Sequence, residues 1–382
     1  MGELIAGIIL GNLVLFGFDY AEPLKTDVVI STLAQLGIIV LLFEVGLETD
    51  FDELKKVGLS SFLVAVIGII APFILGWLVA KLFLGEMATL SHIFIAAMLC
   101  ATSIGITARV FKDLGKIDAR EAQIILGAAV IDDVLALLVL AIVEGAIFSQ
   151  TNGTNLEIST FTIIALKAIG FLVGAILLGK FLVPKIFDSV KKFESKGMVL
   201  GLSLAICFLF AWAASMVGLA AIIGAFAAGL VLEEASFEHF LDHNKHDLID
   251  FLSPITVIFA PIFFVSIGMK VDLRAFGNPE LLIFASALTL AAILGKQACS
   301  LGVLEKGLNK LAIGFGMIPR GEVVLFFAAV GATLSLPNAS GINEPVINSS
   351  TFSAIVILVM ITALLTPPAL KWSLNRKVGE NT

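Results

Sequence analysis

The chain has 382 residues, of which 59% are apolar and 14% charged, and its mean hydropathy is +1.05. Soluble domains are usually about 45–50% apolar and about 25% charged. This composition excludes an ordinary soluble protein and leaves no room for a soluble catalytic domain beside the apolar segments. The net charge of −7 argues against nucleic acid as a partner.

Apolar runs between charged residues or Gly/Pro breaks predict twelve transmembrane helices in an all-α, polytopic membrane protein. Each span needs about 20 apolar residues. Helices are expected throughout, because backbone groups in hydrocarbon must pair within their own segment. The predicted spans are 3–18, 28–47, 58–84, 91–108, 121–146, 160–184, 197–215, 217–233, 249–269, 279–303, 309–333 and 351–373.

Lysine and arginine concentrate in the even-numbered loops and the C-terminal tail, as at Lys55, Lys56, Lys191 and Arg376. Cytoplasmic loops of membrane proteins carry an excess of these residues. We therefore expect a multi-pass protein of the plasma (inner) membrane with a cytoplasmic C-terminus. The three cysteines, Cys100, Cys207 and Cys299, lie inside apolar runs and are expected to be buried and structural.

The fourth predicted span is interrupted by Ala101–Thr107, which includes Thr102 and Ser103. Hydroxyl groups satisfy freed backbone groups or act as oxygen ligands of a hard cation. The alternative is ordinary contact between helices, a common role of Ser and Thr in membranes.

The fifth predicted span contains two adjacent carboxylates, Asp132 and Asp133, near the middle of a long apolar run. A charge at this depth is costly and normally marks an ion path. The two side chains project about 100° apart on a helix. One therefore faces a cavity while the other pairs with a neighbouring helix.

The eighth loop holds three of the four histidines, His239, His243 and His246. A pH sensor or a metal site is one interpretation. A solvated amphipathic loop is the other, and the sequence favours it.

The tenth predicted span contains Lys296, whose buried ammonium needs a counter-charge. An aspartate of the fifth span is the obvious partner, and snorkelling to the cytoplasmic edge is the alternative.

The eleventh predicted span contains Pro319 and Arg320 between Gly316 and Gly321, and Glu322 follows directly. Proline removes a backbone donor and disfavours helix at the preceding residue. This pattern predicts a helix broken at membrane depth, where Arg320 and Glu322 either neutralise the half-helix ends or pair with each other.

The two interrupted spans occupy corresponding places in the order of predicted elements. Spans 3–5 and 10–12 each have their broken helix second, and they begin on opposite sides of the membrane. Broken segments at corresponding positions of two inverted halves point to the binding site of a transporter.

These motifs resemble those of the bacterial cation:proton antiporter-2 family of electrogenic sodium/proton antiporters. The resemblance rests on Ala101–Arg109, Gly127–Asp133, Gly295–Lys296, Pro319–Val323 and the early Gly46–Thr49. It extends essentially from end to end of the chain. It implies a homodimer with inverted repeats and two broken, crossing helices.

The resemblance also implies how the chain is divided into domains. Residues 1–56 and 197–274 would hold the dimerisation helices 1–2 and 7–9, and 151–196 the linker helix 6. Residues 57–150 and 275–382 would hold the core helices 3–5 and 10–12, with the cytoplasmic tail.

The site implied by the resemblance centres on Asp133, which would bind sodium, while Asp132 would form a salt bridge with Lys296. Thr102, Ser103 and nearby carbonyl groups would line the site. Arg320, Glu322 and Pro319 would support the crossing.

The sequence departs from the family pattern in three ways. The most N-terminal family helix is expected to be missing before Gly2, and no nucleotide-binding domain is expected after Thr382. Glu44 occupies a span position that is often uncharged in relatives. It is expected to be either an additional pathway carboxylate or a group near the cytoplasmic mouth.

The predicted function is secondary active exchange of sodium, or lithium, for protons by alternating access, with a role in pH homeostasis. No enzyme activity and no cofactor are expected beyond the transported ions, and the expected surroundings are membrane lipid. Potassium/proton exchange is the nearest alternative, and a cation channel is a more distant one.

Overall fold

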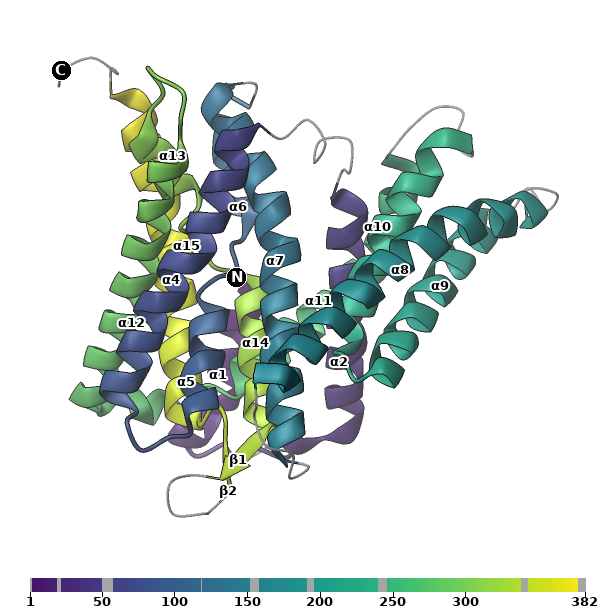
Figure 1. Cartoon of the computed structure of the whole chain (residues 1–382). Helices are drawn as coiled ribbons and strands as arrows, with labels where there is room; N and C mark the ends of the chain where they lie inside the picture. The colour runs from purple at the N-terminus through teal and green to yellow at the C-terminus, as the bar shows by residue number, and fades with distance from the viewer. Residues whose placement is uncertain are drawn as a thin grey trace. The chain divides into compact units, whose positions relative to one another are not determined.

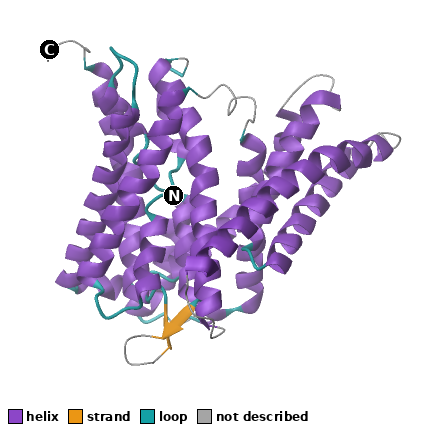
Figure 2. Cartoon of the chain, viewed as in Figure 1, coloured by secondary structure: helices purple, strands orange, loops and turns teal. Residues whose placement is uncertain are grey.

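The computed structural model describes residues 2–18, 22–49, 58–117, 119–151, 158–190, 196–239, 246–337 and 343–376. Helices make up most of this part of the chain (Figure 2). The chain divides into two compact units. The first comprises residues 1–52, 144–146 and 155–271, and the second comprises residues 53–143, 147–154 and 272–382.

Among the described residues, the first unit contains five long α-helices and the shorter α1 (Figure 1). Helix α2 packs against both α10 and α11, α1 packs against α11, and α8 and α9 pack against α10. These helices are α1 (Gly2–Gly11), α2 (Val28–Glu48), α8 (Ile158–Val190), α9 (Lys196–Val217), α10 (Ala221–His239) and α11 (His246–Met269).

Glycines allow a close helix crossing in the first unit. A Cβ atom at Gly229 of α10 would collide with the carbonyl oxygen of Phe43, and one at Gly46 of α2 would collide with that of Phe226. The two backbones therefore touch directly, as small residues permit at helix contacts in membranes. Phe43 itself is fully buried in the apolar core of this unit.

The second unit contains two sets of helices with the same order. The first set is α4 (Leu59–Phe83), α5 (Thr89–Met98), α6 (Ile104–Asp113) and α7 (Arg120–Thr151). The second set is α12 (Pro279–Ala298), α13 (Lys310–Gly316), α14 (Glu322–Thr333) and α15 (Ser349–Asn375). In each set a long helix is followed by two short helices and then by another long helix, as the predicted repeat requires.

The first helices of the two sets run antiparallel against each other. The Phe83 ring of α4 lies 5.6 Å from the Phe284 ring at the start of α12. Near the other end of α12, Gly295 packs directly on Pro72, so residue numbers rise along one helix as they fall along the other. The two sets therefore begin on opposite sides, in agreement with an inverted repeat.

The structure confirms a multi-pass membrane protein. Among the described residues, eight helices are long and apolar enough to span a membrane, and four further apolar helices are shorter. Spans four and eleven are each divided into two short helices, α5–α6 and α13–α14. The twelve predicted spans thus all correspond to helices, and Cys100, Cys207 and Cys299 are buried and unpaired as predicted.

Two local features differ from the predicted elements. The first predicted span is a helix only to Gly11, followed by a 3₁₀ helix at Leu13–Phe16. The segment between α14 and α15 contains a short antiparallel hairpin, β1 (Ser335–Pro337) and β2 (Asn343–Pro345), with Ser335 opposite Pro345. A hairpin of this size pairs its backbone locally, outside the apolar helices.

A polar cluster ties three segments of the second unit together. The Ser60 hydroxyl at the start of α4 donates to Glu305, and Arg120 at the start of α7 lies 3.1 Å from the same carboxylate. The Ser60 hydrogen bond, aided by Arg120, lowers the pKa of Glu305 below its ordinary value. The carboxylate therefore stays ionised and connects these helix ends near neutral pH.

Candidate ion-binding site

The centre of the second unit holds a fully buried ion pair. Lys296 Nζ, in the last turn of α12, lies 2.9 Å from Asp132 Oδ1 and 3.0 Å from Asp132 Oδ2 on α7. Neither side chain has any solvent exposure. Each charge compensates the other in a medium where an unpaired charge would cost several kcal/mol. Of the two aspartates in the fifth span, Asp132 is thus the partner of Lys296, and Lys296 does not snorkel.

Small residues around the lysine make space for this pair. Gly68 of α4 faces Lys296, and a Cβ atom there would lie 3.4 Å from the ammonium nitrogen. Gly295 lets the backbone of α12 approach Pro72 directly. On the other side, the Cys299 thiol donates to the Lys296 carbonyl oxygen. Packing from α4 and the end of α12 thus holds the lysine at the aspartate.

The two helix interruptions meet each other in the second unit. The first covers residues 99–103, between α5 and α6, and the second covers residues 317–321, between α13 and α14. The Ser103 backbone N–H donates to the Pro319 carbonyl oxygen at 2.8 Å. The Thr107 hydroxyl of α6 donates to the Gly316 carbonyl oxygen at the end of α13 at 2.6 Å. Backbone groups freed by one interruption are therefore satisfied by the other.

Arg320 is fully buried at this crossing and donates hydrogen bonds at the carboxyl-terminal ends of two half-helices. Its Nη2 donates to the Leu99 carbonyl oxygen, just after α5, at 2.6 Å. Its Nη1 donates to the Met317 carbonyl oxygen, just after α13, at 3.5 Å. A cation at a helix C-terminus offsets the negative end of the macrodipole. Arg320 therefore neutralises half-helix ends, which was one of the two roles expected for it.

Glu322 occupies the opposite position, in the first turn of α14. A carboxylate there complements the positive end of a helix. The Ser103 hydroxyl donates to Glu322 Oε2 at 3.4 Å. Thr102 is also buried, and its hydroxyl donates to the Met317 carbonyl oxygen and accepts from Arg320 Nη1, both at 3.4 Å.

The charged groups of the crossing and of the ion pair form one electrostatic cluster. Asp132 interacts coulombically with both Lys296 and Arg320. Two buried cations thus share the field of the buried Asp132 carboxylate, and Asp133 follows it on α7. This second aspartate is half-buried.

The remaining predicted residues lie elsewhere. Glu44 is half-buried on α2 in the first unit. His243 lies outside the described residues, as do the side-chain surroundings of His239 and His246, so the pH-sensor hypothesis stays a prediction. Among the described residues, no group of three His, Cys, Asp or Glu side chains gathers in a metal-binding arrangement.

Two contributions to the crossing were missed by sequence reasoning. Thr362 of α15 accepts a hydrogen bond from the Arg320 backbone N–H at 3.3 Å and is fully buried. The Leu99 carbonyl oxygen accepts a hydrogen bond from Arg320, but a backbone group leaves no signal in the sequence. Thr362 could have been found from the sequence. Thr362 and Thr366 are polar residues four positions apart in an apolar span, so they lie on one helical face.

Comparison with known proteins adds independent information. Residues 1–376 match the family described as "Sodium/hydrogen exchanger, transmembrane". The chain is 41% identical over 349 residues to the high-affinity Na⁺/H⁺ antiporter NhaS3 of Synechocystis, covering 90% of this chain and 71% of that protein. It is 36% identical to the Na⁺/H⁺-K⁺ antiporter GerN of Bacillus cereus, over 99% of this chain and 90% of that protein.

A solved structure shows the same fold. The sodium proton antiporter MjNhaP1 from Methanocaldococcus jannaschii superposes with a TM-score of 0.72 at 19% identity, covering 99% of this chain and 92% of that chain. A family match over nearly the whole chain, together with relatives above 30% identity, is decisive. This chain belongs to the transmembrane sodium/hydrogen exchanger family.

Proposed function

We propose that this protein exchanges sodium for protons across the membrane, with Asp133 as the ion-binding carboxylate. The observation that carries the proposal is the buried Asp132–Lys296 pair, directly beside Asp133 and within the field of the two helix interruptions. Ionisable groups at such depth mark ion pathways in membrane proteins. The family and the names of its relatives favour the same exchange.

The mechanism rests on competition between a proton and a sodium ion for the Asp133 carboxylate. Asp133 holds either a proton or a sodium ion, since both together in one buried site would repel each other. Sodium arriving at Asp133 weakens the Asp132–Lys296 pair, so that Lys296 releases a second proton. The protons belong to the coupled cluster rather than to a single residue.

Two protons per sodium would make the exchange electrogenic. One net charge then moves per cycle, and the membrane potential contributes about 2.3 kcal/mol per 100 mV. The binding site would open alternately to the two sides of the membrane.

Oxygen atoms at the crossing would complete the sodium site. Ser103 and backbone carbonyl groups are suitable ligands for a hard cation. Thr102 is a further candidate. Its hydroxyl already accepts a hydrogen bond from Arg320, so a bound sodium would have to displace that hydrogen bond. Glu44 is proposed as either an additional carboxylate of the ion pathway or a group near the cytoplasmic mouth.

The setting of the exchanger is also a proposal. We place it in the bacterial plasma membrane with the C-terminus in the cytoplasm, because Lys and Arg concentrate in the even-numbered loops. Helices of the first unit would form the contact of a homodimer, and the second unit would carry the transport site.

Asp133→Asn tests the assignment. In proteoliposomes with an imposed pH gradient, a pH-sensitive dye should report no sodium-driven dissipation above that of protein-free vesicles. The matched control is Asp113→Asn, which makes the same change at an exposed position at the end of α6 and should retain exchange. Exchange that survives in Asp133→Asn refutes the assignment.

Potassium is the second candidate cation, since GerN carries potassium in its name and is 36% identical to this chain. The same assay with sodium, lithium and potassium additions separates the candidates. A channel would instead give uncoupled current without proton movement.

A further inference from the structure

A cavity of about 340 Å³ lies at one end of the second unit, away from the aspartates. It is formed by the end of α4, the start of α12 and the start of α15. Its size falls within the range of about 300–1,000 Å³ that small-molecule sites occupy. By the charge distribution of the loops, this end of the three helices faces the outside.

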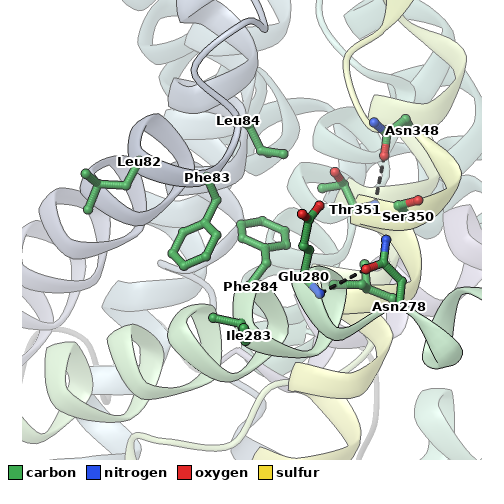
Figure 3. A pocket seen from close by; sticks show the side chains of 11 residues that line it. Leu82, Phe83, Leu84, Asn278, Glu280, Ile283, Phe284, Asn348, Ser350 and Thr351 are labelled. Atoms are coloured by element: carbon green, nitrogen blue, oxygen red, sulfur yellow. Dashed lines mark hydrogen bonds between the residues drawn. The ribbon is translucent and has the colours of Figure 1, made fainter.

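One side of the cavity is apolar (Figure 3). Phe83 and Phe284 form a ring pair there, and Leu82 and Ile283 beside them are 79% and 57% exposed. Side chains as apolar and exposed as these are covered by acyl chains in a membrane protein. The cavity is therefore bounded by hydrocarbon on this side.

The opposite side is polar. Asn278 and Asn348 cap α12 and α15, and their Oδ1 atoms accept from the Glu280 and Thr351 backbone N–H groups at 2.9 and 2.8 Å. These bonds fix the amide orientation, so each Nδ2 group is left as a donor. Within the described part of the chain, neither Nδ2 group has an acceptor, and the Ser350 hydroxyl has no partner.

The Glu280 carboxylate stands between the two sides (Figure 3). The carboxylate is exposed, and no described residue donates a hydrogen bond or supplies a cation to it. The cavity thus offers one anionic acceptor, several neutral donors and an apolar wall. A ligand that matches all three has an ammonium group, an anionic oxygen group and a hydrocarbon tail.

We propose that this cavity binds the headgroup of an ethanolamine phospholipid. The ammonium donates to Glu280, the phosphate oxygens accept from Asn278, Asn348 and Ser350, and one acyl chain follows Phe83 and Phe284. The positive ends of α12 and α15 add to the attraction for phosphate. A choline headgroup has no N–H donor for Glu280, and a glycerol headgroup has no cation.

The test is competitive lipid binding to the purified full-length protein. After delipidation, the protein is equilibrated with equimolar ethanolamine, choline and glycerol phospholipids of the same acyl chains, and bound lipid is measured by native mass spectrometry. We expect ethanolamine lipid to be retained about two- to fivefold over choline lipid, because only the ethanolamine ammonium donates a charge-assisted hydrogen bond to the exposed Glu280 carboxylate.

Two variants and one control complete the test. Glu280→Gln should lower the ethanolamine-to-choline ratio, because the neutral amide oxygen accepts a weaker hydrogen bond from the ammonium than the carboxylate does. Asn348→Asp keeps a helix cap but replaces the donor by a carboxylate, so it should lower phospholipid retention. Glu86→Gln, in the nearby loop but outside the cavity lining, should leave the ratio unchanged.

The proposal is overturned by any of three results. These are equal retention of ethanolamine and choline lipids by the unaltered protein, preferential retention of the glycerol lipid, and an ethanolamine-to-choline ratio that is unchanged in Glu280→Gln.

Discussion

At the residue scale, the buried pair of Asp132 and Lys296 is the most consequential contact of the molecule. Both side chains are fully buried and joined through both carboxylate oxygens. Such a pair contributes little net stability over an apolar replacement, yet removing one partner leaves a costly unpaired charge. The pair therefore links the protonation of one site to the folding of the second unit.

A double-mutant comparison follows from this asymmetry. Asp132→Asn should destabilise the protein by about 3–5 kcal/mol, because Lys296 loses its counter-charge in a buried site. Asp132→Asn combined with Lys296→Met should regain part of that loss, since no buried charge remains. Thermal unfolding in detergent measures both. A double variant less stable than Asp132→Asn would contradict the interpretation.

At the scale of elements, the two broken helices are stabilised by each other and by single side chains. Four helix ends lie inside the membrane, where water cannot satisfy their backbone groups. Arg320 binds the carbonyl groups after α5 and α13, and Glu322 sits at the start of α14. The Thr107 hydroxyl satisfies the last turn of α13.

The Thr107 hydrogen bond can be tested alone. Thr107→Val keeps the shape of the side chain but leaves the buried Gly316 carbonyl without its donor, which should cost about 1–3 kcal/mol. The matched control is Thr32→Val on α2, where the hydroxyl is exposed and bonds within its own helix. Equal shifts of the unfolding temperature in the two variants would argue against a special role for Thr107.

The sequence predicted the second interruption accurately and the first one less so. Pro319 between two glycines is a strong local signal, and the break at residues 317–321 surrounds it. The first break was expected at Ala101–Thr107, but α6 already begins at Ile104, and the break extends back to Leu99. Its position is set by Arg320 and by the Pro319 carbonyl oxygen, which are more than 200 residues away in the chain.

At the scale of the whole molecule, both units contain close packing at glycines, and the buried ion pair distinguishes the second unit. The second unit is organised around buried charges and helix ends. The first unit contains direct backbone contact between α2 and α10, at Gly46 and Gly229. The hydrophobic effect does not drive helices together in lipid. Close van der Waals packing at small residues stabilises such crossings instead.

Gly229→Ala tests this contact. A methyl group would collide with the Phe43 carbonyl oxygen, so α2 and α10 must separate, at a cost of about 1–3 kcal/mol. Gly201→Ala on α9 is the control, because a methyl group there meets nothing within 4 Å. Thermal unfolding should distinguish the two variants, and a neutral Gly229→Ala would show that the crossing is not tight.

The sequence by itself determined the membrane class, the number of spans and the identity of the charged residues inside them. It did so because hydropathy and the cost of buried charge act on each segment separately. The tertiary structure decided where the first helix interruption begins and ends and which carbonyl groups Arg320 binds. It also formed the cavity at Glu280 from three distant segments. These features depend on contacts between residues far apart in the chain, and no local pattern encodes them.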